Sequence, residues 1–329
     1  MNTNSRRFES HVIAGGAGFL GSNLVRKLLR FQEVREIVVL DNYSSGSITN
    51  LDGVLDDPRL KVIETDISQK TPELNGNFNW IWHLAALANP TDYEKYPVDT
   101  LNVNSDGNKN LIWLAQKYQA GYIYFSSSEV YGLYNTIPSK GLNEKETISR
   151  LMLGKPRSPY AVGKCFGEEL TQHLCRLYGI HYLIIRPFNI YGPYMDVKTN
   201  YGRVIPNFIT WALQKEPLRI NGDGTQIRTF CYIDDFVTAV LKIINHPSPV
   251  SVVNIGSPFP TPIRDLADVI NGLLGNKTAP LFVERYPFEP YARIPDLRCI
   301  KQFTGWKPHI DLINGLNKTI CWFKSKIKP

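Results

Sequence analysis

Tyr160 and Lys164 are the two residues whose types and spacing most directly suggest chemistry. They follow Ser158 and Pro159, which are start signals for a helix, and residues four apart share one helix face. An ammonium group beside a phenol stabilises the phenolate and lowers the pKa of the tyrosine. With Ser127 from FSSSEVYG, the tyrosine could take a proton from a substrate hydroxyl while a hydride leaves the same carbon. Tyr and Lys four apart also occur on solvated helix faces, so the pair alone is weak evidence.

A glycine-rich segment near the N-terminus supplies an independent signal. Gly15, Gly18 and Gly21 form GxxGxxG between a short apolar strand and a helical pattern. Such glycines allow a tight turn and a close approach of the backbone to a pyrophosphate at the helix N-terminus. Asp41 follows the next strand, about twenty residues further on, where a carboxylate binds the adenosine ribose. No Arg or Lys follows Asp41 in NYSSGS, so the sequence predicts NAD rather than NADP.

Smaller signals extend this predicted cofactor site. Asp66 and Ile67 follow the third predicted strand and could flank the adenine. After the fourth strand, small residues would let the backbone approach the cofactor. The complete set of predicted cofactor-binding residues is Gly15, Gly18, Phe19, Leu20, Asp41, Asn42, Asp66, Ile67, Leu84, Ala85, Ala86, Tyr160 and Lys164.

Strand and helix patterns alternate along most of the chain. Predicted strands cover residues 11–14, 36–40, 60–64, 79–84, 122–126, 182–186 and 250–255. Helical patterns cover residues 22–31, 98–118 and 312–323, and one begins at 158. The alternation predicts an α/β fold, an NAD-binding Rossmann domain with a doubly wound parallel sheet. We expect that domain to comprise residues 1–188 and 231–257, interleaved with a smaller substrate lobe of residues 189–230 and 258–329.

Composition narrows the class of protein. The 329 residues carry a net charge of +7 without a clustered basic stripe, so we expect no nucleic-acid partner. No apolar run approaches the roughly 20 residues of a membrane span, and no signal peptide is apparent, so we expect no membrane association. The cysteines are five in number and lack CxxC spacing, which indicates reduced thiols in a cytoplasmic protein and no metal site.

The motifs AGGAGFLG, HLAA, FSSSEVYG and YAVGK occur in this order along the chain, and the resemblance that they define extends from about His11 to Phe323. The chain resembles the extended short-chain dehydrogenase/reductases that modify nucleotide sugars. HLAALANPTDYEKYPVDTLNVN, SEVYG, GKPRSPY and ARIPD are most similar to segments of the UDP-glucuronate decarboxylases. Departures from that family are Ala14, Leu87, Ser127, Tyr194 and a longer loop over 196–201.

The resemblance implies roles for individual residues. The implied catalytic residues are Ser127, Ser128, Glu129, Tyr160, Lys164 and Arg293. The implied substrate-binding residues are Arg157, Asn189, Arg203, Arg228 and Arg293. In the resembled family, the helix that begins at Ser158 joins a four-helix homodimer interface, so we expect a homodimer and a nucleotide-diphosphate sugar as substrate.

Oxidation of carbon 4 of a nucleotide-linked glucuronate would place a carbonyl beta to the carboxylate. Loss of carbon dioxide is then feasible without a metal, and return of the hydride recycles NAD. A 4-epimerase or 4-dehydrogenase needs only Ser127, Tyr160 and Lys164 and stays open. A 4,6-dehydratase is disfavoured because Ser128 occupies the place of an acid. A non-catalytic NAD-sensing regulator would usually have lost the tyrosine or the lysine.

Overall fold

The computed structural model describes residues 8–133, 141–145, 153–197, 203–246, 250–285 and 288–327. Most of the loop over 196–201, in which the chain departs from the resembled family, lies outside the described residues. No described helix is long and apolar enough to cross a membrane.

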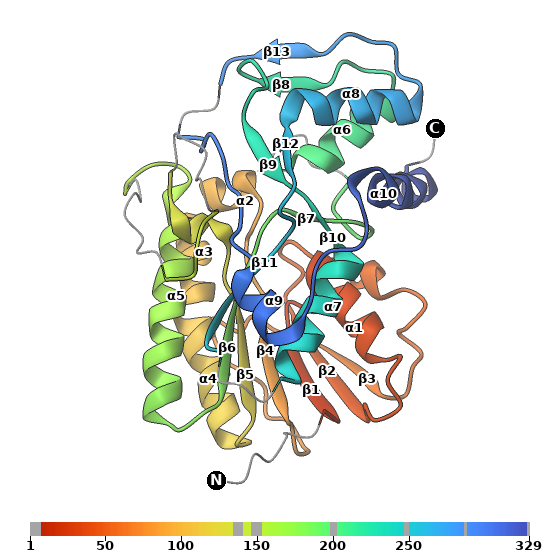
Figure 1. Ribbon diagram of the computed structural model, residues 1–329. Coiled ribbons are helices and arrows are strands. Elements are labelled where there is room, and N and C mark those ends of the chain that lie inside the picture. Colours follow the sequence, from red (N-terminus) through yellow and green to blue (C-terminus); the bar gives the residue numbers. More distant parts are fainter. Residues whose placement is uncertain are drawn as a thin grey trace.

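A seven-stranded parallel sheet forms the centre of the larger part of the molecule (Figure 1). Its spatial order is β11-β6-β5-β4-β1-β2-β3. The strands are β1 (Ser10–Ala14), β2 (Glu36–Asp41), β3 (Leu60–Glu64), β4 (Trp80–His83), β5 (Gly121–Phe125), β6 (Tyr182–Pro187) and β11 (Val252–Ile255). The predicted doubly wound parallel sheet is confirmed, including the return of a late strand beside β6.

Helices cover both faces of this sheet, which explains why its strands are apolar on both sides. One face carries α1 (Phe19–Leu28), α7 (Ile233–Ile244) and α9 (Arg298–Thr304), and the other α3 (Pro97–Asn104), α4 (Asp106–Lys117) and α5 (Ser158–Leu177). Successive strand side chains point to opposite faces. Ile13 and Val39 accordingly pack in the core with α1 and α7, while Val12 and Val38 pack in the core with α4 and α5.

Two helices differ from the sequence-based expectation. The pattern over 98–118 is not one helix, because Ser105 leaves the helical conformation (φ −103°, ψ −81°) and separates α3 from α4. Ser and Asp compete with helical hydrogen bonding, and both lie at this break. The first helix begins at Phe19 rather than at residue 22, which brings its N-terminus directly against Gly18.

A smaller set of elements lies beyond the carboxyl ends of the strands (Figure 1). It contains three two-stranded sheets that pair β7 (Ile190–Tyr191) with β10 (Cys231–Tyr232), β8 (Arg219–Asn221) with β13 (Leu281–Val283), and β9 (Ile227–Thr229) with β12 (Pro260–Pro262). Its helices are α6 (Val204–Leu213), α8 (Ile263–Leu274) and α10 (Leu312–Lys326). The short helices η1 (Ile48–Leu51), α2 (Pro90–Lys95) and η2 (Ser128–Tyr131) lie in loops that follow strands of the large sheet.

Candidate active site

A cavity of about 1440 Å³ lies at the carboxyl ends of the parallel strands, between the large sheet and the smaller elements. In doubly wound sheets, ligands bind at this edge. The cavity is lined by every residue that the sequence analysis predicted for the cofactor, the chemistry or the substrate. Residues from distant parts of the chain are thus brought to one space.

The glycine loop shapes one end of the cavity. Gly15 has φ +81°, and a Cβ on it would lie 2.5 Å from the backbone nitrogen of Ala85. Only glycine fits there, because both the left-handed backbone and the close approach exclude a side chain. A Cβ on Gly18 would meet just one atom within 4 Å, so the loop leaves an open cradle before α1. This is the shape that a pyrophosphate requires at a helix N-terminus.

Asp41 lies at the end of β2 beside this loop. Its carboxylate accepts hydrogen bonds from the backbone N–H groups of Ala17 and Tyr43, each at 2.9 Å. Burial raises the pKa of Asp41, and these N–H donors oppose the rise. The carboxylate is therefore held in one position against the glycine loop, where a second lone pair of each oxygen can accept from a ribose hydroxyl.

Lys164 is almost completely buried on α5, and its Nζ donates to the carbonyl oxygen of Phe125 at 2.8 Å. The ammonium lies 5.8 Å from the centre of the Tyr160 ring, as the spacing of four residues predicted. Burial lowers the pKa of Lys164 to about 7, although Glu168 one turn further along α5 opposes this. The group therefore changes charge near neutral pH.

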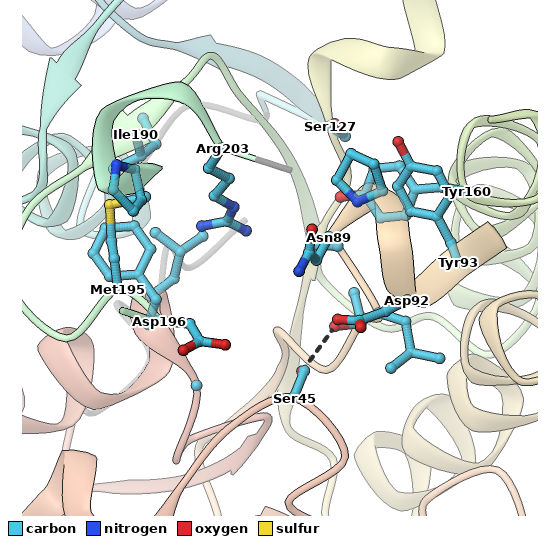
Figure 2. A pocket seen from close by; sticks show the side chains of 18 of the residues that line it. Ser45, Asn89, Asp92, Tyr93, Ser127, Tyr160, Ile190, Met195, Asp196 and Arg203 are labelled. Carbon is cyan, nitrogen blue, oxygen red and sulfur yellow. Dashed lines mark hydrogen bonds between the residues drawn. The ribbon is translucent and has the colours of Figure 1, made fainter. Parts of the chain in front are cut away.

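The environment of Tyr160 differs from the expectation in one respect. Burial raises the pKa of Tyr160, and the groups that counteract it are led by a hydrogen bond with Ser127 and by the charge of Arg203. The effect predicted for Lys164 is not among these leading causes, because its Nζ is directed to a backbone carbonyl. The Tyr160 ring also stacks on Tyr93, with centroids 5.3 Å apart. In Figure 2, Arg203 extends into the cavity opposite the stacked rings.

Glu129 lies two residues after Ser127 on η2 and is clamped by two arginines. Both of its carboxylate oxygens accept from Arg293, with Oε2 at 2.8 Å from Nη2, and Nη2 of Arg157 lies 3.4 Å from Oε1. Burial alone would raise the pKa of Glu129, but Arg293 and then Arg157 outweigh it and lower the pKa to about 2. Glu129 is thus ionised at any physiological pH, and its N–H donates to Ser127 Oγ at 3.1 Å.

Asn189 and Arg228, the remaining predicted substrate residues, also line the cavity. Asn189 donates its amide to the carbonyl oxygen of Thr229 at 3.0 Å, which fixes its orientation. Arg228 pairs with Glu289 at 2.7 Å and donates to the carbonyl of Ile227 at 2.8 Å. Burial lowers the pKa of Arg228 to about 10, with Glu289 opposing.

Sequence reasoning gave no role to two residues that the structure places in this site. Tyr93 stacks on Tyr160, and Arg157 forms a hydrogen bond with the Tyr93 hydroxyl. Tyr93 lies in HLAALANPTDYEKYPVDTLNVN, a segment similar to the decarboxylases, so the sequence carried a signal for it. Glu289 lies 61 residues from its partner Arg228, and no local pattern marks it.

Comparisons with known proteins agree with this geometry. Residues 11–256 match the model of the NAD dependent epimerase/dehydratase family. UDP-glucuronic acid decarboxylase 3 of Arabidopsis thaliana is 37% identical over 309 residues, which are 93% of this chain and 86% of the relative. The chain belongs to the NAD dependent epimerase/dehydratase family.

Other members of this family are also similar to the chain. A putative UDP-glucose 4-epimerase of Methanocaldococcus jannaschii is 33% identical over 319 residues, 95% of this chain and 98% of the relative. The solved structure of a dTDP-glucose 4,6-dehydratase from Streptomyces venezuelae, with NAD bound, has a TM-score of 0.86 at 27% identity. It covers 96% of this chain and 97% of that chain. These similarities support the family and its use of NAD, and they do not separate its reactions.

NAD is the cofactor of this family, and the residues present fit it. The open cradle at Gly18, the fixed Asp41 carboxylate and the N-terminus of α1 lie on one side of the cavity, with Tyr160 and Lys164 further along it. Among the described residues, no group of three or more His, Cys, Asp or Glu side chains is arranged to hold a metal ion.

Proposed function

We propose that the protein oxidises carbon 4 of UDP-glucuronate, releases its carboxylate as carbon dioxide and forms UDP-xylose with recycling of NAD. The observation that carries this proposal is the group Arg293, Glu129 and Arg157 beside Ser127 and Tyr160. Arg228 and Glu289 lie near this group, so three guanidinium groups are balanced by only two carboxylates. The resulting net positive charge suits the carboxylate of a substrate.

The first step is assigned to three residues. Tyr160 takes the proton of the carbon 4 hydroxyl, and Ser127, which already shares a hydrogen bond with Tyr160, contacts the same oxygen. Lys164 supports the phenolate from the same helix face. When bound, NAD supplies the acceptor for the hydride that leaves carbon 4 and later returns it. The proton held by Tyr160 goes back to the carbon 4 oxygen at that point.

The second step breaks the bond between carbon 5 and the carboxyl carbon. Its electron pair passes into the enolate that the carbon 4 carbonyl stabilises, and carbon dioxide leaves. Carbon 5 must then gain a proton. Because Arg293 and Arg157 hold the pKa of Glu129 near 2, Glu129 does not act as the proton donor in this arrangement. We assign to it the orientation of a water molecule that supplies the proton, and the hydroxide left by that water combines with the released carbon dioxide as bicarbonate. To the two arginines we assign the orientation of the substrate carboxylate.

Contacts with the diphosphate of the substrate complete the proposal. Arg203, Arg228 and the amide of Asn189 are expected to contact the diphosphate. Because Arg228 already pairs with Glu289, its contact with a phosphate requires an exchange of partners.

A 4-epimerase is the second candidate function, supported by the similarity to the Methanocaldococcus jannaschii protein named a putative UDP-glucose 4-epimerase. A 4-dehydrogenase that releases the keto-sugar uses the same residues. A 4,6-dehydratase requires a base at carbon 5. Glu129 with a pKa of about 2 is a weak base, which disfavours that reaction.

Incubation with a panel of UDP-, dTDP- and GDP-sugars and analysis by mass spectrometry distinguishes these reactions. Loss of carbon dioxide from UDP-glucuronate is the expected outcome. Turnover of a neutral nucleotide sugar without a change in mass, together with inert UDP-glucuronate, would establish the epimerase instead. Loss of water would indicate a dehydratase.

We also propose that the protein is a homodimer formed through α5. Phe166 and Leu177 on α5 are 51% and 73% exposed, and the neighbouring helices α3 and α4 expose Val98 and Trp113. Apolar side chains on three adjacent helices are unusual for a monomer surface. Light scattering should give twice the chain mass at micromolar concentration, and Phe166→Glu should reduce it to one chain mass. A wild-type monomer contradicts this proposal.

A further inference from the structure

A buried ion pair joins α5, the helix that carries Tyr160 and Lys164, to the strand β6. Glu168, one turn after Lys164, accepts from Nε and Nη2 of Arg186 at 2.8 and 2.6 Å. It also accepts from the hydroxyl of Ser126 at 2.5 Å, the residue before Ser127. The pair therefore connects α5, β6 and the end of β5. Ser127 follows β5, and Tyr160 lies on α5.

Tyr131 extends this network to the turn that carries Ser127 and Glu129. It is the last residue of η2 and is only 2% exposed. Its hydroxyl accepts from Nη1 of Arg186 at 2.9 Å and donates to Oδ1 of Asn254 on β11 at 2.8 Å. The Arg186 guanidinium also lies 4.9 Å from the centre of the Tyr131 ring.

Asn254 continues the network towards Arg293. Its Nδ2 donates to the carbonyl of Leu142 at 2.8 Å. Leu142 in turn exchanges backbone hydrogen bonds with Ile294 at 2.8 Å and with Asp296 at 2.9 Å. The segment that presents Arg293 to Glu129 is therefore attached to the same set of buried groups as the turn that presents Glu129.

Stability alone is a weak explanation for these groups. A buried ion pair often contributes little or nothing relative to apolar residues of the same size, and fixing the register of structural elements is the best supported use of such pairs. Glu168, Arg186, Tyr131 and Asn254 do not line the cavity, so ligand contact does not explain them either.

We propose that Tyr131 is a positioning residue for the oxidation of carbon 4. Its hydroxyl holds η2, with Ser127 and Glu129, in register with α5, which carries Tyr160 and Lys164. The proposal rests on the proposed oxidation at carbon 4 and does not depend on the later loss of carbon dioxide.

Tyr131→Phe removes the hydroxyl and keeps the ring, so it is the direct test. Formation of NADH in a single turnover should slow about tenfold, the effect of losing one hydrogen bond to a charged group. The Kd for NAD and the KM for the sugar nucleotide should stay within about twofold of wild type, because Tyr131 touches neither ligand site. UDP-glucuronate and UDP-glucose are both used, so that oxidation is detected in a decarboxylase or an epimerase.

Tyr122→Phe is the matched control. Tyr122 is a fully buried tyrosine on β5, and its hydroxyl donates to Oδ1 of Asn108 on α4 at 2.5 Å. The Tyr122→Phe variant should lose stability to a similar extent as Tyr131→Phe, while its rate of NADH formation stays near that of the wild type. Equal loss of rate in both variants, or an unchanged rate in Tyr131→Phe, would overturn the proposal.

A second measurement is independent of any substrate. Amide hydrogen exchange of the NAD-bound protein should be about tenfold faster over residues 126–132 in Tyr131→Phe and unchanged there in Tyr122→Phe. If Tyr131→Phe does not fold, Asn254→Leu, which removes the acceptor of the same hydroxyl, should show the same local acceleration. If neither sugar is oxidised by the wild type, the proposed function is wrong, and this measurement still decides whether Tyr131 fixes the turn. Unchanged exchange over 126–132 would refute the positioning role.

Discussion

The two ends of the cavity are built in different ways. At the cofactor end, backbone groups and glycines form the surface, and the carboxylate of Asp41 is satisfied by two backbone N–H groups close by. At the substrate end, charged side chains from η2, the start of α5 and the segment near residue 293 are satisfied by one another. One end is fixed by the main chain and the other by ion pairs.

This difference has a consequence for binding. The cofactor end presents an anion cradle without rearrangement of its own hydrogen bonds. The substrate end must exchange some of its internal ion pairs for contacts with the ligand, and a buried charge that loses its partner is costly. We therefore expect substitutions at the cofactor end to change affinity and substitutions at the substrate end to change the chemical steps.

Tyr160→Phe should have the largest effect. General acid–base catalysis typically contributes about 10²–10⁴-fold, so NADH formation from a bound sugar nucleotide should fall by that factor. The Tyr93 ring can still stack on phenylalanine, so NAD should bind with nearly unchanged Kd. Stopped-flow absorbance of NADH measures the rate, and calorimetry measures the affinity. A rate within threefold of wild type would mean that another group takes the proton.

Arg293→Ala should reduce turnover of UDP-glucuronate about ten- to hundredfold, the value of one charge-assisted contact. NAD binding should stay intact, which separates this variant from general unfolding. Because Arg293 and Glu129 are paired, the double variant Arg293→Ala with Glu129→Gln should lose less than the product of the two single losses. Steady-state kinetics on the four proteins measures the coupling.

Glu129→Gln alone should slow the steps after oxidation more than oxidation itself, so NADH should accumulate during turnover. Strictly multiplicative losses in the double variant would show that the observed ion pair plays no part in the reaction. Unchanged turnover of UDP-glucuronate in Arg293→Ala would make Arg293 a structural residue.

The same contrast explains what the sequence predicted. The positions of the sheet strands along the chain followed from short apolar runs, to within about two residues of the observed bounds, and the glycine loop with Asp41 is a local motif in which spacing determines geometry. Tyr160 and Lys164 share a helix turn, so their proximity also follows from spacing. The break at Ser105 was missed although residues 104–110 (NSDGNKN) carry no large apolar side chain, and Ser105 and Asp106 compete there with helical hydrogen bonding.

The sequence predicted the individual residues of the substrate end but not the contacts between them. Glu129 and Arg293 are 164 positions apart, and nothing in the sequence says that they pair rather than act separately on a substrate. The low pKa of Glu129 and the pairing of Arg228 with Glu289 depend on that assembly. The expected lowering of the Tyr160 pKa by Lys164 considered the pair alone. Burial of the tyrosine and the direction of the lysine Nζ could not be seen from spacing.

Asp41→Asn tests the cofactor end and should have a moderate effect. We expect the wild type to bind NAD far more tightly than NADP, because a carboxylate at this position repels a 2′-phosphate and accepts from a 2′-hydroxyl. The substitution should reduce this preference about tenfold, since the charge is lost while one acceptor stays. Calorimetric Kd values for both cofactors measure it.

Asp66→Asn is a control at the same end of the cavity. Asp66 is predicted to flank the adenine, a part that both cofactors share, so its loss should change both Kd values by a similar factor. Equal affinities of the wild type for NAD and NADP would contradict the assignment of Asp41.

The smallest effect that we expect is the effect of Lys164→Met on stability, which is separate from any loss of rate through the Tyr160 phenolate. Burial lowers the pKa of Lys164 from its usual 10.5 to about 7. Below pH 7 the folded protein therefore holds a buried charge, and above pH 10.5 neither the folded nor the unfolded chain is charged there. Between these values the unfolded chain binds more protons, so the wild type gains stability as the pH rises. Methionine removes the charge, and the variant should be more stable at pH 6.5 by about 1 kcal/mol, a gain that fades towards pH 9.5. Calorimetric Tm values of the NAD-free proteins at pH 6.5, 8 and 9.5 measure this.

Lys61→Met is the control, because the exposed pair of Lys61 with Glu36 should contribute less than about 0.5 kcal/mol at each of these pH values. If Lys164→Met is less stable than the wild type at all three, the hydrogen bond from Nζ to Phe125 outweighs the cost of burying the ammonium. In that case Lys164 holds β5 and α5 together in addition to supporting the phenolate.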